Sequence, residues 1–165
     1  PHKAEGAMPS TKIKAFLDDH GVKYVSVSHS TAYTAQEAAA MAHIPGKELA
    51  KTVIVKLDDA MAMAVLPASY HVDLVKLAEV TDSQVVELAT EAEFSTLFPD
   101  CDTGAMPPFG NLYNLPVYVA ESLAEDEEIA FAAGSHRELI RMAYADFNRL
   151  VEPNVMRFSE ITVPV

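Results

Sequence analysis

The sequence predicts a single α+β domain built around a mixed, mostly antiparallel sheet. Short apolar runs typical of strands recur along the chain, separated by tight turns and by short segments with helical spacing. These elements lack the regular strand–helix alternation of a doubly wound parallel sheet. The chain has 165 residues, half of them apolar, which is enough for one domain with its own hydrophobic core.

Capping residues and apolar spacing predict the helices. Ser10 can cap the first helix and Gly21 can end it. Thr34 and Thr90 are each followed three residues later by glutamate, a capping-box pattern that opens a helix. The predicted helices cover residues 10–20, 34–43, 72–79, 90–98 and 144–150.

Alternating or continuous apolar runs predict the strands. The pair Asp58-Asp59 separates two such runs and predicts a strand–turn–strand hairpin. Residues 99–116 are rich in proline and glycine, and a loop of this length in a small domain is usually functional. The predicted strands cover residues 24–28, 52–57, 60–66, 85–88, 117–120, 129–133 and 138–142.

Composition limits the possible functions. The chain carries 12 Lys and Arg against 24 Asp and Glu, and a net charge of −12 argues against binding duplex DNA. No run approaches the ~18 apolar residues of a membrane span. The single cysteine, Cys101, excludes an intrachain disulfide and favours a reducing cytoplasm. Residues 1–7 are expected to be a tag or a disordered start, and residues 8–165 the single domain.

Lys51 is the first candidate for a functional side chain. It precedes the apolar run Val53-Ile54-Val55, so its stem can pack on apolar surface while its ammonium enters a cleft. There it could neutralise a phosphate or a developing oxyanion. The alternative is a solvated lysine at a strand end, and spacing alone favours that alternative.

The segment 104–110 is the second candidate. Pro107 and Pro108 stiffen it, while Gly104 and Gly110 permit close approach of backbone to a ligand. Such a loop could press rigid backbone, with Phe109 beside it, against a small ligand. A purely structural turn between a helix and a strand is the alternative.

The segment Gly134-Ser135-His136 follows an apolar strand and is the third candidate. Its glycine would let backbone amides face a ligand, and its imidazole could donate, accept or fill volume, although a structural histidine is the common case. No pair of histidines has a metal-binding spacing, so neither a metal nor a cofactor is predicted. A nucleophile formed by Cys101 and His136 is disfavoured, because flanking aspartates oppose the thiolate.

The order of these features is more specific than any one of them. The features are a Lys-Thr-Val-Ile-Val-Lys strand at 51–56, a second strand into Pro67, a helix at Asp73-Leu74, the segment Gly104-x-x-x-Pro108-Phe109-Gly110, and a strand into Gly134-Ser135-His136. Over about residues 10–152 this order resembles the YbaK-type family. That family includes the editing domain inserted in bacterial prolyl-tRNA synthetases and its free-standing relatives.

The resemblance implies a fold, an activity and site residues. The family fold is a barrel-like mixed sheet surrounded by short helices, and its activity is hydrolysis of the ester that joins a wrong amino acid to the 3′-terminal adenosine of a tRNA. Lys51 matches the functional lysine of the family, and Gly104 and Pro108 match its glycine–proline loop. Gly134 and His136 match a loop of small residues and histidine, where members vary.

A trans-acting deacylase in the cytoplasm is therefore expected, which removes alanine, cysteine or serine from mischarged proline tRNA. Its partner would be the acceptor end of the charged tRNA, with a synthetase as a further candidate and no membrane. Lys51 would anchor phosphate and stabilise charge, while Pro107, Pro108 and His136 would wall a pocket small enough to exclude the correct amino acid. The alternative is a binding module that holds an aminoacyl-nucleotide or a nucleic-acid end without cleaving it.

Overall fold

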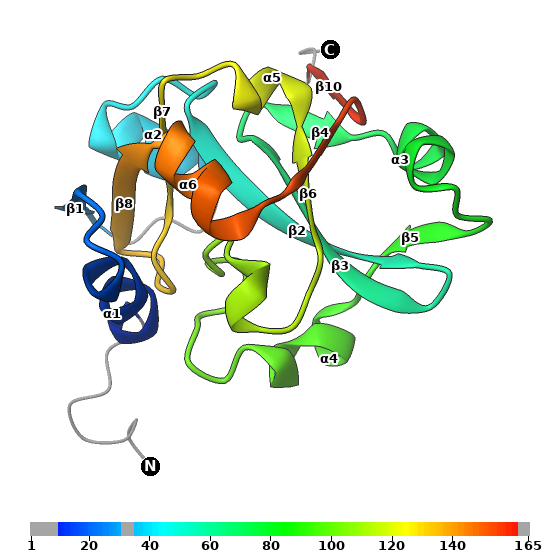
Figure 1. The fold of residues 1–165 in the computed structure, drawn as a ribbon, viewed down its shortest axis with the longest axis horizontal. Coiled ribbons are helices and arrows are strands. Elements are labelled where there is room, and N and C mark those ends of the chain that lie inside the picture. Colours follow the sequence, from blue (N-terminus) through cyan, green and yellow to red (C-terminus); the bar gives the residue numbers. More distant parts are fainter. Residues whose placement is uncertain (1–9, 31–34, 162–165) are drawn as a thin grey trace.

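The computed structural model describes residues 10–30 and 35–161, which form one mixed sheet, a small second sheet and short helices (Figure 1). Within these residues the strands are β1 (Tyr24–Ser28), β2 (Leu49–Leu57), β3 (Ala60–Pro67), β4 (Tyr70–Val72), β5 (Val86–Leu88), β6 (Val117–Ala120), β7 (Glu128–Ala132), β8 (Glu138–Ala143), β9 (Asn154–Met156) and β10 (Ser159–Ile161). The α-helices are α1 (Thr11–Asp19), α2 (Ala35–Ala42), α3 (Leu74–Thr81), α4 (Glu91–Phe94), α5 (Glu121–Ala124) and α6 (Tyr144–Val151). The 3₁₀ helices are η1 (Ser95–Leu97) and η2 (Gly110–Leu112).

The main sheet combines antiparallel hairpins with parallel neighbours. Its strand order is β1-β8-β7-β2-β3-β6-β9, with β5 paired to β2, while β10 and β4 form the second sheet. The pairs β1–β8, β7–β8, β2–β3 and β2–β5 are antiparallel, whereas β2–β7, β3–β6 and β6–β9 are parallel. The predicted mixed, mostly antiparallel sheet is therefore confirmed.

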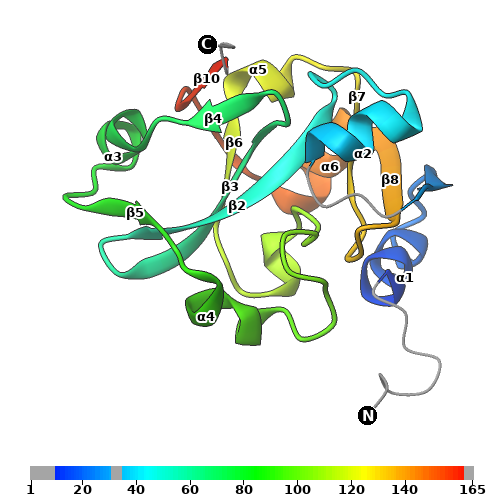
Figure 2. The same cartoon turned by 180° about the vertical axis from the view of Figure 1, so that it is seen from behind.

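Each face of the main sheet is covered by different elements. The helices α1 and α6 and the loop before β6 pack on one face, around a buried core in which the Phe109 ring lies 5.4 Å from that of Phe131 and 5.3 Å from that of Phe147. On the opposite face, α2 packs over one end of β2 and α3 packs near the other end. Figure 1 shows α6 in front of the sheet, and Figure 2 shows α2 in front of it.

Local sequence signals explain most element boundaries. Asp58 and Asp59 have φ values of 49° and 73°, the left-handed pair that a two-residue hairpin turn needs. Thr90 forms the predicted capping box, accepting from the backbone N–H of Glu93 at 3.2 Å. The helix predicted from residue 72 begins instead at Leu74, because the Asp73 side chain caps it.

Two of the predicted helix caps, Ser10 and Thr34, were not confirmed. Ser10 occupies the N-cap position of α1 but makes no capping hydrogen bond, so the predicted cap is wrong. The Ser10 side chain is buried and bonds to Glu138 on β8 instead. Thr34, the predicted cap of α2, lies outside the described residues, as does the predicted tag at 1–7. None of the helices in the described ranges is long and apolar enough to cross a membrane.

Candidate functional site

The parallel strands β2 and β7 separate after only two residue pairs. Their pairing ends at Ala50 and Phe131. Beyond that point, the next backbone bond on this edge of β2 within the described residues is at Ile54, whose carbonyl accepts from the N–H of Ala89 at 2.9 Å. Residues 51–53 of β2 therefore border a fork in the sheet.

The loop that precedes the two prolines enters this fork beside β7. Ala133 donates to the carbonyl of Glu138 on β8 at 3.1 Å, so the next residue, Gly134, turns its backbone toward the opposite, β2 edge. Gly134 donates to the carbonyl of Ala105 at 2.9 Å and accepts from the N–H of Asp102 at 2.7 Å. The segment 102–105 thus takes the place beside β7 that β2 leaves.

These bonds bring two of the three candidate segments into contact. A Cβ atom added to Gly104 would lie 3.6 Å from Cε1 of His136. Gly104 is exposed with φ +85°, and Gly134 is buried with φ +98°, both in the region that side chains rarely adopt. The glycines are therefore required by backbone geometry where the two loops meet.

Lys51 lies on the face of the sheet that α2 and α3 cover. Its directly opposite residue on β3 is Leu66, and directly opposite side chains share one face. Along β2, Lys51 lies between Leu49, which packs with α2, and Val53, which packs with α3. Ala50 and Phe131 lie opposite each other on the other face of the sheet. Because successive residues of a strand alternate between faces, Gly134, two residues beyond the end of β7, lies on the same face as Lys51. Lys51 and the contacting loops thus flank the same fork.

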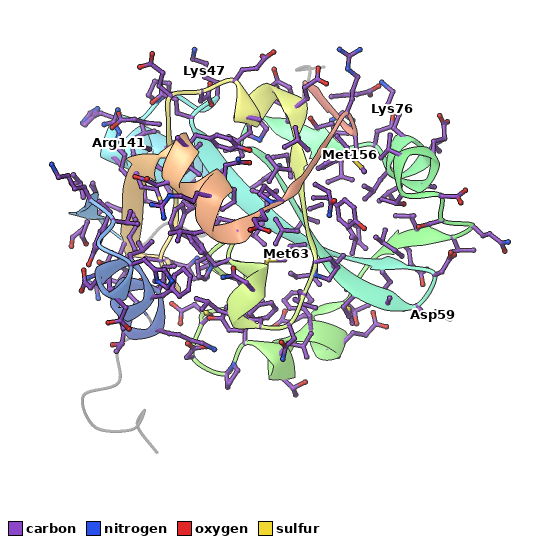
Figure 3. All side chains as sticks on the ribbon, in the orientation of Figure 1. Lys47, Asp59, Met63, Lys76, Arg141 and Met156 are labelled. Carbon is purple, nitrogen blue, oxygen red and sulfur yellow. The ribbon has the colours of Figure 1, made fainter. Side chains whose placement is uncertain are left out.

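The Lys51 ammonium is half-buried and has no carboxylate partner among residues 10–30 and 35–161. Burial lowers its pKa, with no opposing charge to raise it. Six other cationic side chains of the described chain form ion pairs, namely Lys14, Lys56, Lys76, Arg141, Arg149 and Arg157. Figure 3 shows that Lys47, Lys76 and Arg141 are spread around the periphery. Because no carboxylate of the described residues neutralises it, the Lys51 ammonium is available to an external anion.

The proline end of the candidate loop is an anchor in the core. Pro107, Pro108, Phe109 and Gly110 are buried, whereas Gly104 is exposed. A Cβ atom at Gly110 would come within 2.3 Å of the carbonyl oxygen of Leu115, so that glycine is needed for packing. The exposed glycine end can face a ligand, while the buried end fixes its position.

Two further residues have mainly local roles. The Ser135 hydroxyl accepts from the N–H of Arg137 at 3.2 Å, which closes the turn into β8. The Cys101 Sγ lies 3.5 Å from the Tyr113 hydroxyl, and burial, together with nearby Asp100, raises the pKa of Cys101 to about 11. A thiol that stays protonated near neutral pH is a poor nucleophile, in agreement with the sequence argument.

Asp102 is a residue that our sequence analysis missed as part of the site. Its backbone N–H bonds to Gly134, and its carboxylate Oδ2 accepts from the N–H of His136 at 3.3 Å. Its carbonyl also accepts from the N–H of Ala105 at 3.0 Å. Asp102 therefore clips the two loops together. The available signal was its position two residues before Gly104, since aspartate often bonds to nearby backbone in tight turns.

The chemistry open to this fork is electrostatic and positional. A half-buried ammonium can hold an anionic group or stabilise an oxyanion, and the exposed glycine loop can fix a small acyl group beside it. Within the described residues, no group of three or more His, Cys, Asp or Glu side chains is placed to hold a metal ion.

Comparison with known proteins adds a family to this geometry. The sequence profile of the aminoacyl-tRNA editing domain family matches residues 29–150. The chain is 28% identical over 163 residues to the multifunctional Ser/Thr-tRNA deacylase ProXp-y of Escherichia coli strain K12, an alignment that covers 94% of this chain and 95% of the relative.

Solved structures share the fold at lower sequence identity. The crystal structure of a protein named as a candidate trans-editing enzyme for prolyl tRNA synthetase superposes on this chain with a TM-score of 0.79 at 23% identity. The superposition covers 96% of this chain and 99% of the other. The crystal structure of the hypothetical protein APE2540 superposes with a TM-score of 0.80 at 22% identity, covering 90% and 99%. At these identities the superpositions establish the fold.

Proposed function

Because the chain belongs to the aminoacyl-tRNA editing domain family, we propose that it is a free-standing deacylase that acts in trans on mischarged tRNA. The near-complete alignment with a Ser/Thr-tRNA deacylase supports this activity. The observation that carries the proposal is the fork between β2 and β7, which the unpaired Lys51 ammonium and the loops of Gly104 and His136 flank.

In the proposed mechanism, the residues of the fork position an ester that is already activated. Water attacks the ester carbonyl, the acyl–oxygen bond breaks, and the amino acid and the ribose hydroxyl of the tRNA are released. The Lys51 ammonium anchors the terminal phosphate and stabilises developing negative charge, without acting as the base. Such a reaction depends on orientation more than on a strong nucleophile. It therefore does not need the nearby Cys101 thiol, whose raised pKa keeps it protonated.

We propose that the substrate carries a small amino acid of the alanine, cysteine or serine class on proline tRNA. The name of the E. coli relative supports hydroxyl-bearing amino acids, because it specifies serine and threonine. His136 beside Gly104 would limit the space for the side chain, with Gly134 and Ser135 shaping the second loop and residues 107–110 holding the first. A small second site can reject a larger, correct amino acid that a synthetase accepts.

The test is a set of proline tRNAs charged with alanine, cysteine, serine, threonine or proline, incubated with the pure protein and scored for loss of the amino acid. We expect release of at least one small amino acid and retention of proline. Binding of every charged tRNA without release would favour the binding-module alternative. Duplex DNA serves as a control and should not bind at physiological salt, because the net charge is −12.

Two further parts of the proposal follow from the substrate. Charged tRNA is found in the cytoplasm, so we propose that location for the protein. A synthetase that supplies mischarged tRNA is the candidate protein partner. Fractionation of cells that express a tagged full-length chain tests the location directly.

The Asp102 clip provides a prediction about rate. Asp102→Ala should lower kcat about tenfold or more, with a smaller change in KM, because the His136 backbone loses its side-chain acceptor on the first loop while Lys51 still binds the substrate. Asp102→Asn keeps an oxygen acceptor for the His136 N–H and should stay within about threefold of wild type. Single-turnover kinetics and thermal unfolding of both variants measure these effects. Equal losses in both variants would contradict an alignment role that acts through the hydrogen bond.

The pKa of Lys51 predicts an alkaline limit to activity. The charged ammonium is the functional form, so activity should be constant below its pKa and fall as pH rises through it. Burial lowers that pKa, and the fall should therefore begin below the ordinary lysine value of about 10.4. Lys51→Arg, whose guanidinium stays charged, should show no such fall in its residual activity. Rates corrected for spontaneous ester hydrolysis at each pH provide the measurement.

A further inference from the structure

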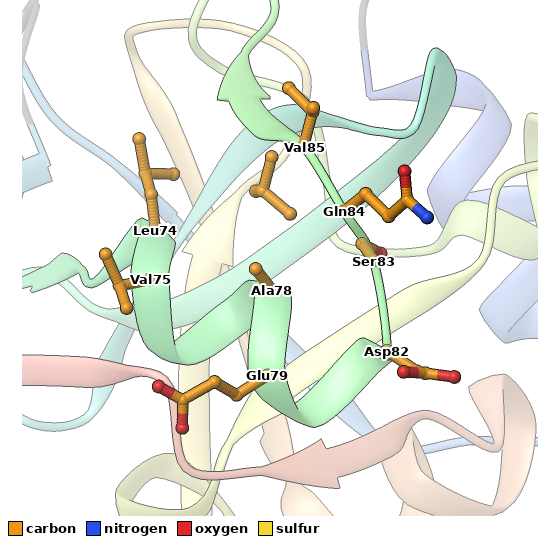
Figure 4. A pocket seen from close by; sticks show the side chains of 9 residues that line it. Leu74, Val75, Ala78, Glu79, Asp82, Ser83, Gln84 and Val85 are labelled. Carbon is orange, nitrogen blue, oxygen red and sulfur yellow. The ribbon is translucent and has the colours of Figure 1, made fainter.

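We propose that the groove between α3 and β5 is a docking surface for a protein partner, which presents an extended segment of alternating aliphatic and basic side chains. The groove has a volume of about 530 Å³, and its apolar lining includes Leu74 and Ala78 (Figure 4). Val86 also lines it. Helix α3 forms one wall and the chain from Asp82 to Val85 forms the other. The proposal is independent of the deacylase activity.

Exposed aliphatic side chains are concentrated at this corner of the molecule. Among the described residues, six large hydrophobic side chains are exposed, and four of these lie on α3, β5 or the segment between them. They are Val75 at 69%, Val80 at 37%, Val85 at 60% and Leu88 at 55%. Val75 and Val85 stand on opposite walls of the groove. A gathering of exposed apolar side chains at one place on a folded protein, as opposed to single scattered ones, is a mark of an interaction surface.

The backbone of β5 favours an extended partner. The Val85 carbonyl accepts from Asp58 and the Ala89 N–H donates to Ile54, both at 2.9 Å, so the odd-numbered residues of this strand face β2. By strand alternation, the N–H and C=O groups of Val86 and Leu88 face the outer edge. A segment laid along that edge could extend the sheet while its side chains fill the groove.

The charge of the groove selects a basic partner. Glu79 and Asp82 line it, and none of the described residues that line it is a lysine or an arginine. Asp82 also caps the C-terminal end of α3, where the helix dipole adds negative potential. These features oppose an RNA backbone, and a chain with net charge −12 would repel a second copy of itself here. A partner segment with lysine or arginine next to aliphatic residues would match both the acidic side chains and the apolar lining of the groove.

The groove and the proposed catalytic fork can be occupied together. Strand β5 pairs with residues 55–57 of β2, four to six positions beyond Lys51. At about 3.3 Å per residue, this places them about 13–20 Å apart along β2. None of the described residues that line the groove belongs to the fork, so we expect a bound partner to leave the aminoacyl end of the tRNA in place.

The test uses the full chain, ¹⁵N-labelled, and a capped seven-residue peptide of alternating lysine and valine. We expect saturable shifts of the amide signals confined to residues 74–88. Charge reversal of both acidic groove residues, Glu79→Lys with Asp82→Lys, should weaken binding about tenfold or more. The matched control is a glutamate–valine peptide, which should not bind.

Several results would overturn this inference. They are absence of shifts at millimolar lysine–valine peptide, equal binding of the glutamate–valine peptide, or unchanged affinity in the double variant with its thermal unfolding unaltered. Sedimentation of the wild-type protein should show a monomer. Self-association that Val85→Lys abolishes would instead assign the groove to a second copy of the chain. Deacylation by Val85→Lys should equal that of wild type, which separates this test from that of the catalytic proposal.

Discussion

Lys51→Ala is expected to lower kcat/KM for deacylation by about 10²–10³-fold while the fold is retained. Removing one preorganised electrostatic group from a partly desolvated site commonly costs this much. Lys51 has no carboxylate partner in the described part of the chain, so its loss leaves no unpaired acid behind. Single-turnover hydrolysis of a mischarged tRNA measures the rate, and circular dichroism measures the fold.

The same position should show a conflict between activity and stability. In the folded state burial disfavours the ammonium, so the pKa is lower than in the unfolded chain and the charged form weakens the fold below that pKa. Lys51→Met keeps the apolar stem between Leu49 and Val53 without the charge. We expect it to be inactive and to gain about 0.5 kcal/mol or more in unfolding free energy at neutral pH.

Lys56 is the matched control on the same strand. Its ammonium lies 2.6 Å from Glu93 and 3.2 Å from Glu87, so its charge is already neutralised by the protein. Lys56→Met should keep wild-type deacylation and show no gain in stability. If Lys51→Ala retains full activity, or if Lys56→Met loses as much activity as Lys51→Ala, the role proposed for Lys51 is wrong.

Local signals in the sequence were enough for many of the elements. The turn at Asp58-Asp59 and the capping box at Thr90 depend on residues a few positions apart, and both were confirmed. The short strands β4, β9 and β10 were not predicted, because three residues give little periodicity. Ser10 does not cap α1 because its hydroxyl bonds to Glu138, a residue distant in the sequence.

The arrangement of the site needed the tertiary structure. The fork depends on parallel pairing of β2 with β7, elements about 80 positions apart in sequence, which no local pattern specifies. Residue patterns singled out Lys51, Gly104 and His136 as candidates, and the resemblance to a family matched them to its functional positions. It could not separate the exposed Gly104 from the buried residues 107–110, since both lie in one short motif. Asp102 was overlooked because its bonds join two loops.

Gly104→Val is expected to lower deacylation about 10²-fold, with a loss of stability of only about 1–2 kcal/mol. The Cβ atom would lie 3.6 Å from His136, and the two methyl groups beyond it would enter the space where we place the aminoacyl group. The backbone at φ +85° adds strain for any side chain. The effect of backbone strain on activity must therefore be separated from the effect of blocking the aminoacyl group.

Gly21→Val provides that separation. Gly21 is also exposed and has φ +65°, but an added Cβ atom there meets nothing within 4 Å. Both variants should lose similar unfolding free energy, because both force a β-branched residue into left-handed backbone. Only Gly104→Val should lose activity, and Gly104→Ala should fall between it and wild type, most strongly for the larger of two edited amino acids. Equal activity of Gly104→Val and Gly21→Val on every charged tRNA would mean that the substrate does not approach the 104 loop.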